Sequence, residues 1–224
     1  MKNPLPAVAC LTCLSLGGCM SFWPFFTEKL EARSQYVSLM PVAGDARWEP
    51  LDFGFNGQPT IAPDLLSIPS SERLSGVAFK GDLDALLGPA HENYEITLQA
   101  QRIDGHDIFL GLTFPVGPKE SASLVLGGWG GSVCGISLVD GLSANENAHQ
   151  TIRHFEDKEW HTVKLRVDAK EIRAWIDGDT LFTVVRKPET HFSVRAEVEP
   201  TAPLGLFTFA TTAQIRCLAV RKLP

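Results

Sequence analysis

The chain has 224 residues, 44% of them hydrophobic and 21% charged, which is enough apolar material for one sizeable folded domain. Its formal net charge of −6, with no basic block, argues against a nucleic-acid partner, because phosphate backbones are bound by clustered lysine and arginine. The 19 glycines and 15 prolines are ordinary for strands and turns and too few for a disordered chain.

The first 26 residues, MKNPLPAVACLTCLSLGGCMSFWPFF, differ from the rest of the chain. Residues 7–16 form an apolar run that is too short to span a bilayer and fits the apolar region of a secretory signal. The run ends in LGGC, which resembles a bacterial lipobox, so we predict a signal peptide over residues 1–19 with lipidation at Cys19. A plain signal peptide or an uncleaved anchor are the alternatives. Residues 20–44 would then be a tether and lead-in, and the protein would be a membrane-anchored lipoprotein of the cell envelope, facing the periplasm or the exterior.

Strand patterns dominate from Trp48 onward. Residues 94–103, YEITLQAQRI, alternate apolar and polar side chains with a period of two, which predicts a half-buried strand. Residues 161–185 predict a series of hairpins, with a turn at Asp177-Gly178 of the kind that joins antiparallel strands. Further strands are predicted over 108–114, 121–128, 133–141, 204–212 and 213–223.

Helical periodicity is nearly absent, apart from one possible turn of helix in DLDALLG near Asp82. We therefore predict an all-β fold over residues 45–224, a two-sheet antiparallel jelly-roll sandwich with about a dozen strands.

The segment GGWGG places one aromatic residue, Trp129, among four glycines between two apolar strands. Glycine lets a ligand or another backbone approach closely, and an indole offers a flat apolar face that stacks on the C–H faces of a sugar. The alternative is a glycine-flanked bulge with Trp129 folded into the core. No helix-forming segment follows GGWGG, so it is not a nucleotide-binding loop.

A polar loop, DGLSANENAHQT, follows the next strand. Its carboxylates and amides could bind sugar hydroxyls or a hard cation, or could only cap turns. The spacing does not match an EF-hand, so no metal and no cofactor are predicted. The candidate saccharide-binding residues in this loop are Asp140, Asn145 and Asn147, with Glu146 as a possible base.

Asp104 and Asp107 flank a turn, where a carboxylate could serve as acid or base or could bond its own backbone. Cys134 and Cys217 could pair, but both lie in apolar strands, which favours two small buried hydrophobes. The alternating set Lys164, Arg166, Arg173 and Trp175 predicts a solvated sheet face, or a sugar platform if that sheet is the concave one.

Four segments together carry a family resemblance: ENYEITLQAQRIDGHDIFLGLTFPVG, LVLGGWGGSVCGISLVDGLSANEN, WHTVKLRVDAKEIRAWIDGDTLF and PLGLFTFATTAQIRCLAVRKL. They resemble an envelope branch of the 3-keto-disaccharide hydrolase domain family, which is similar to family 16 glycoside hydrolases. The resemblance covers roughly residues 36–223 and implies a concanavalin A-like jelly roll that acts on 3-keto-glucosides. Removal of the C2 proton beside the ketone and expulsion of the glycosidic oxygen would need a base and a donor to the enolate oxygen.

The sequence departs from the better-known branch of that family. The N-S-G-I-x-x-R motif is replaced by residues 106–112, and the glutamate of the preceding strand stands as Gln99 or Gln101. No catalytic residue is carried over at those positions. An enzyme would use Asp107 or Glu146 as the base, Asn145 or Asn147 as the enolate donor and Trp129 as the platform. The alternatives are a non-catalytic carbohydrate-binding module, or a structural or protein-interaction sandwich.

Overall fold

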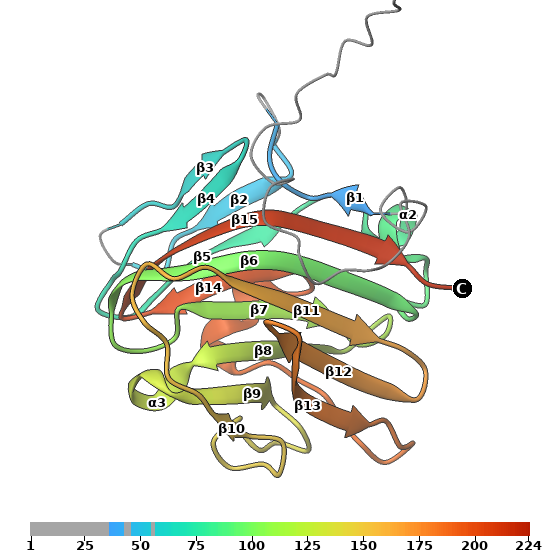
Figure 1. Cartoon of the computed structure of the whole chain (residues 1–224). Helices are drawn as coiled ribbons and strands as arrows, with labels where there is room; N and C mark the ends of the chain where they lie inside the picture. Colours follow the sequence, from blue (N-terminus) through green and yellow to red (C-terminus); the bar gives the residue numbers. More distant parts are fainter. Residues whose placement is uncertain (1–35, 43–45, 55–56) are drawn as a thin grey trace, which may run out of the picture.

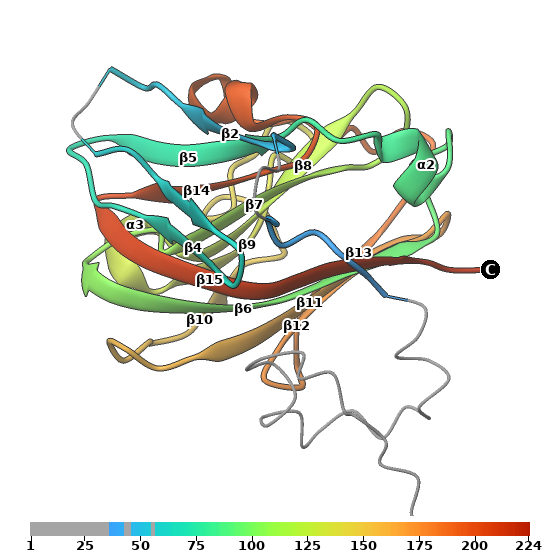
Figure 2. The same cartoon turned by 90° about the horizontal axis from the view of Figure 1, so that it is seen from above.

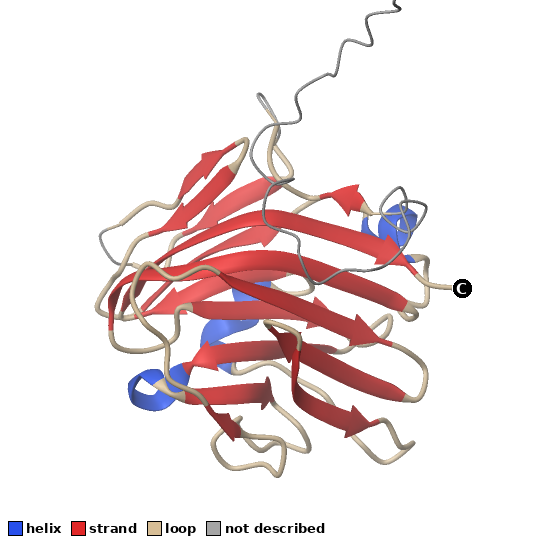
Figure 3. Cartoon of the chain, viewed as in Figure 1, coloured by secondary structure: helices blue, strands red, loops and turns tan. Residues whose placement is uncertain are grey.

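The computed structural model describes residues 36–42, 46–54 and 57–224, and strands are the main secondary structure of this part of the chain (Figure 3). The predicted leader over residues 1–19, the lipidation site Cys19 and most of the predicted tether lie outside the described residues. Within them, no helix is both long and apolar enough to cross a membrane.

The first sheet, here called the β6 sheet, has the strand order β13-β12-β11-β6-β15-β4-β3, and β1 pairs with β15 beside this path (Figure 1). All its pairings are antiparallel. Because β1 belongs to it, the sandwich includes two residues from the range predicted as a tether. Its strands are β1 (Val37–Ser38), β3 (Thr60–Ala62), β4 (Leu65–Ile68), β6 (Tyr94–Gly105), β11 (His161–Val167), β12 (Glu171–Ile176), β13 (Asp179–Val185) and β15 (Thr211–Lys222).

The second sheet, here called the β7 sheet, has the order β10-β9-β8-β7-β14-β5-β2 and is also antiparallel. Figure 2 shows the two sheets as stacked layers, with β5, β14, β7 and β8 in one and β15, β6 and β11 in the other. The predicted two-sheet jelly-roll sandwich is confirmed. The strands of this sheet are β2 (Trp48–Leu51), β5 (Leu74–Phe79), β7 (Leu110–Pro115), β8 (Ser121–Gly127), β9 (Val133–Ser137), β10 (Thr151–Ile152) and β14 (Gly205–Phe209).

The core fills the space between the sheets, and period-two alternation decides which side chains enter it. On β11, Val163 and Leu165 are buried in the core, while Lys164 and Arg166, which alternate with them, face outward. Tyr94 also points inward, and its hydroxyl donates a hydrogen bond to the carbonyl of Pro115 in the opposite sheet, 2.5 Å away. Burial raises the pKa of Tyr94 well above its ordinary value, so the ring stays neutral and ties the two layers together.

In the described part of the chain, three short helical turns interrupt the strands. The predicted turn is present as α2 (Leu83–Leu87), where the Asp82 carboxylate caps the N-terminus by accepting a hydrogen bond from the Ala85 N–H at 3.0 Å. The other two are α3 (Gly128–Gly131) and the 3₁₀ helix η1 (Ala196–Thr201), and both border the site described next.

Candidate functional site

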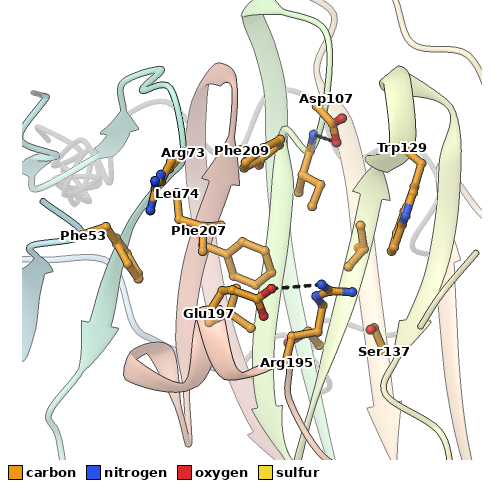
Figure 4. A pocket seen from close by; sticks show the side chains of 14 residues that line it. Phe53, Arg73, Leu74, Asp107, Trp129, Ser137, Arg195, Glu197, Phe207 and Phe209 are labelled. Atoms are coloured by element: carbon orange, nitrogen blue, oxygen red, sulfur yellow. Dashed lines mark hydrogen bonds and ion pairs between the residues drawn. The ribbon is translucent and has the colours of Figure 1, made fainter. Parts of the chain in front are cut away.

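A hollow of about 530 Å³ lies on the outer face of the β7 sheet, away from the core (Figure 4). Its surface is mainly apolar, with a few polar and charged groups around the rim, as is usual for a site that takes a small ligand. The lining residues are Phe53, Arg73, Leu74, Asp107, Ile108, Ser123, Val125, Trp129, Ser137, Arg195, Glu197, Val198, Phe207 and Phe209.

The floor of the hollow is built around Phe207 of β14, whose ring lies in the middle of Figure 4. Its partners on the two neighbouring strands are both glycines, Gly76 on β5 and Gly111 on β7. A methyl group at Gly111 would come within 2.2 to 2.4 Å of three Phe207 ring atoms, so the ring lies directly over that glycine. The missing side chain lets the aromatic ring lie flat along the sheet and keeps the space above it open.

Trp129 stands at one edge of the hollow on a left-handed turn. The φ angles are positive at Gly127 (72°), Trp129 (49°), Gly130 (89°) and Gly131 (100°). Glycine adopts such angles readily, whereas a tryptophan does not, so the glycines make possible a turn that holds the indole outward. Trp129 is 39% exposed and lines the hollow, and it is therefore not folded into the core.

Asp107, in the connection between β6 and β7, holds that turn in place. One carboxylate oxygen accepts a hydrogen bond from the Gly130 N–H at 3.1 Å, and the other accepts one from the Ile108 N–H at 2.9 Å. The Asp107 N–H donates to the Thr211 hydroxyl at 3.0 Å. The structure thus brings together Asp107 and Trp129, and both Asp107 oxygens already accept hydrogen bonds from backbone groups.

The opposite wall carries an ion pair from the segment around η1. The Arg195 guanidinium lies 3.0 Å from a carboxylate oxygen of Glu197, and its other terminal nitrogen donates to the Ser143 hydroxyl at 3.0 Å. The hydrogen bond from Arg195 lowers the pKa of Glu197, so this carboxylate is ionised at neutral pH. In Figure 4 the guanidinium points into the hollow between Glu197 and Trp129.

Hydroxyl groups line the sheet below this wall. Thr113 on β7, Ser123 on β8 and Ser137 on β9 are successive partners across the sheet. The Thr113 hydroxyl is bonded to Ser123 at 3.2 Å and to Thr201 of η1 at 2.6 Å. The Ser137 hydroxyl is buried and has no hydrogen-bond partner among the described residues, although Ser137 lines the hollow. A buried hydroxyl of this kind is a ready partner for a polar group of a ligand.

The predicted polar loop lies beside the hollow, but none of its four candidate residues lines it. An Asp140 carboxylate oxygen accepts from the His191 N–H at 2.8 Å, and Glu146 accepts from the Ser143 N–H at 3.1 Å. The buried Asn147 amide donates to three backbone carbonyls, at 2.8 to 3.3 Å. The Asn145 side-chain oxygen is buried without a partner among the described residues. Three of the four side chains therefore support the loop's own backbone or that of a neighbouring segment.

The expectation of two small buried hydrophobes holds for Cys134 but not for Cys217, which is disulfide-bonded. Cys134 is a free thiol inside β9, so it does not pair with Cys217, and burial raises its pKa to about 11. A thiol with so high a pKa is a poor nucleophile. The described residues contain no group of three His, Cys, Asp or Glu side chains placed to hold a metal ion.

The comparisons with known proteins agree with this architecture. Residues 74–221 match the model of a family described as the 3-keto-alpha-glucoside-1,2-lyase-like domain. The chain belongs to this family. The matched span begins at β5 and ends in β15, so it includes most strands of both sheets and nearly every residue of the hollow. A search of the curated proteins finds no match.

Solved structures resemble this 3-keto-glucoside lyase-like domain in fold. The carbohydrate-binding module CBM66 from Bacillus subtilis superposes with a TM-score of 0.50 at 10% identity, over 79% of this chain and 96% of that one. The apo transglycosylase Crh5 gives 0.55 at 7% identity, over 84% and 83%. The exoplasmic domain of VIP36, bound to Ca²⁺ and Man3GlcNAc, gives 0.53 at 11% identity, over 86% and 90%. Likeness at this level of identity shows the fold alone.

Sequence reasoning missed Arg195, Glu197, Phe207 and Ser137. Arg195 and Glu197 fall in a segment without periodicity or motif, and nothing local indicates that it returns to the β7 sheet. Phe207 reads as an ordinary core residue of a strand. The useful signal was compositional: Gly76 and Gly111 interrupt otherwise apolar strands, and a glycine inside a strand often marks the close approach of another group.

Proposed function

We propose that this domain binds a saccharide in the hollow of the β7 sheet, with Trp129 as the stacking platform. The observation that carries the proposal is the strained left-handed turn at Trp129. This turn holds the indole half-exposed at the rim of the hollow, whose floor is Phe207. Family membership and the sugar-binding proteins among the structural neighbours support the same ligand class.

The polar groups of the hollow suit sugar hydroxyls. The Ser137 hydroxyl can donate to one ligand oxygen and accept from another. The Arg195 guanidinium has five N–H donors, and its bonds to Glu197 and Ser143 leave some of them for a ligand. Apolar stacking at Trp129 and hydrogen bonds at the opposite wall would thus hold the two sides of one sugar ring.

The test is a titration of the chain with 3-keto-glucosides, 3-keto-disaccharides and their unoxidised parents. Trp129→Ala is expected to weaken binding about tenfold, equivalent to about 1.4 kcal/mol of lost stacking. Trp175→Ala, an indole on the opposite sheet, is the matched control and should leave this binding unchanged. Equal binding by wild type and Trp129→Ala would contradict the proposal.

A second candidate function, cleavage of 3-keto-glycosides, is favoured by the family match and by the Arg195–Glu197 pair. Glu197 would take the C2 proton, the electron pair would pass to the C3 oxygen as an enolate, and Arg195 would stabilise that oxygen. Collapse of the enolate would form the C1=C2 bond and expel the glycosidic oxygen, which takes a proton from water.

Glu197→Gln is a sharper test than a substitution of Asp107, because Asp107 also supports the Trp129 turn and its removal would disturb binding. We expect Glu197→Gln to lower turnover of a 3-keto-glucoside by at least about a hundredfold, the range for removal of a general base, with binding largely kept. If neither the wild type nor the variant turns over any 3-keto sugar that both bind, the domain is a binding module.

Anchoring to the cell envelope through Cys19 stays a proposal based on the LGGC sequence. Incorporation of labelled palmitate into the wild type but not into Cys19→Ser would support it. Unchanged labelling of the variant would exclude this site of lipidation.

A further inference from the structure

The outer face of the β6 sheet, on the other side of the sandwich from the hollow, gathers cations and indoles. Strand alternation sends these side chains outward from β6, β11, β12 and β15, while their neighbours fill the core. We call this set the cationic face. Its cations are Lys164, Arg166, Arg173, Arg216 and Arg221, its carboxylates are Glu95 and Glu171, and its indoles are Trp160 and Trp175.

Cations crowd together on this face. Arg166 on β11 lies directly opposite Arg173 on β12, and like charges in such pairs disfavour the sheet. Both are placed over the same indole: the guanidinium carbons of Arg173 and Arg166 lie 5.7 and 5.9 Å from the ring centre of Trp175, and the Lys164 ammonium lies 4.6 Å from it. The Arg173 Nε atom is buried and has no hydrogen-bond partner among the described residues.

Buried Glu95 fixes the geometry of the cluster. Its carboxylate accepts two hydrogen bonds from Arg166, at 2.8 and 3.0 Å, and one from Arg221 at 2.6 Å. The side chain of Glu95 is fully buried, whereas that of Arg166 is 37% exposed. The carboxylate thus orients the guanidiniums without removing Arg166 from solvent, so a bound anion would meet pre-organised donors.

A second cation–indole pair lies further along the same face. The Arg216 guanidinium stacks on Trp160 at 3.9 Å from the ring centre and donates to the Gln99 side-chain oxygen at 2.8 Å. Gln99 also bonds Thr162, at 3.3 Å, and so links the pair to β11. Trp160 immediately precedes β11, whereas Trp175 on β12 pairs with Lys164 inside β11, so the two indoles lie at separate positions on one surface.

We propose that the cationic face binds a glycan chain that carries carboxylate groups, such as a uronic-acid polymer. Guanidinium groups match carboxylates, and the indoles, amides and threonine hydroxyls between them match sugar faces and hydroxyls. Charge complementarity supports the choice, because this face is rich in cations on a chain of net charge −6. An anionic membrane would need neither the amides nor the hydroxyls, and the acidic remainder of the chain would oppose it.

The test uses the full chain with an oligogalacturonate and, as a matched neutral ligand, the same oligosaccharide fully methyl-esterified. Binding of the charged form is expected to weaken about tenfold in Arg173→Gln and in Trp175→Ala, and to fall as salt is raised. The esterified form should bind at least about tenfold more weakly than the charged form. Trp129→Ala, in the hollow, should leave the preference for the charged form unchanged.

Other outcomes would overturn the proposal. These are equal binding of the two forms, binding that both variants retain, or loss of binding in Trp129→Ala alone. Binding only to phosphatidylglycerol vesicles would assign the face to lipid, and no binding to any probe would remove the site. Thermal melting of both variants checks folding, and Arg173→Gln, a half-exposed substitution, is expected to melt as the wild type does. Because the hollow is tested with neutral 3-keto sugars, failure here leaves the saccharide proposal for the β7 sheet unaffected.

Discussion

At the scale of single residues, the hollow depends on a backbone conformation that tryptophan does not favour. A left-handed residue other than glycine costs about 1 kcal/mol, and Trp129 adopts this conformation with φ at 49°. The hydrogen bond from the Gly130 N–H to the Asp107 carboxylate offsets this cost from outside the turn. Asp107 therefore acts first as a support for the aromatic platform, whatever chemistry follows.

Replacing Asp107 by Asn tests this support. Only one side-chain oxygen remains, so the N–H groups of Gly130 and Ile108 cannot both be satisfied. We expect a loss of about 1 kcal/mol in the free energy of unfolding, the typical net value of one hydrogen bond. Trp129 should also become more mobile, measured as lower fluorescence anisotropy in a chain whose other tryptophans are replaced by Phe. An unchanged free energy of unfolding and unchanged anisotropy would show that the turn stands without Asp107.

At the scale of elements, the floor of the hollow depends on the pairing of Phe207 on β14 with a glycine on each neighbouring strand, β5 and β7. Gly111→Ala places a methyl group against the Phe207 ring, which must then tilt into the hollow. We expect a cost of about 1–3 kcal/mol, typical of overpacking, together with weaker saccharide binding. A double-mutant cycle with Phe207→Ala isolates the contact, because the cost of Gly111→Ala should shrink once the ring is gone. Additive effects of the two substitutions would contradict this account of the floor.

The strands were predictable from sequence because burial imposes a period of two on residues 94–103 and 161–176, and the sheet faces follow from it. The four glycines around Trp129 mark its turn as unusual in the sequence itself. The residues that form the site are harder to predict from the sequence. Asp140 and Asn147 have the chemistry of a sugar site, but the same oxygens and amides satisfy backbone groups, and local sequence does not separate the two uses. Arg195 and Glu197 reach the hollow through tertiary structure that no local pattern encodes.

At the scale of the whole molecule, the two sheets present different chemistry to solvent. The β7 sheet offers a mostly apolar hollow, and the β6 sheet offers a cationic face organised around one buried carboxylate. Glu95 and Asp177, whose pKa values are lowered despite burial, lie in the β6 sheet and beside it, whereas Glu197, whose pKa is also lowered, is largely exposed at the hollow. The pKa of Asp177 is lowered although burial would raise it, because His161, the Thr162 N–H and Arg153 stabilise the anion. Stability in acid should therefore depend on this side of the sandwich.

The dependence of stability on pH should be clearest at Glu95. Burial alone would raise its pKa, but hydrogen bonds from Arg166 and Arg221 bring it below the ordinary value of 4.5. The unfolded chain thus binds the proton more readily, and the stabilisation, complete above pH 4.5, is lost as the pH falls through the folded-state pKa. Glu95→Gln removes the carboxylate that pairs with buried Arg221 and should cost about 3 kcal/mol at pH 7 in urea unfolding.

The difference in free energy of unfolding between Glu95→Gln and the wild type should become smaller in acid, where the wild-type carboxyl is itself protonated. Glu171→Gln is the control, because Glu171 forms a partly exposed ion pair with Arg173 at 2.7 Å. This substitution should lower the free energy of unfolding by no more than about 0.5 kcal/mol. If this difference in free energy of unfolding stays constant from pH 7 to strong acid, lost packing rather than lost charge explains the effect of Glu95→Gln. A gap that closes as the pH falls would identify the buried carboxylate as the group that makes the cationic face compatible with a stable sheet.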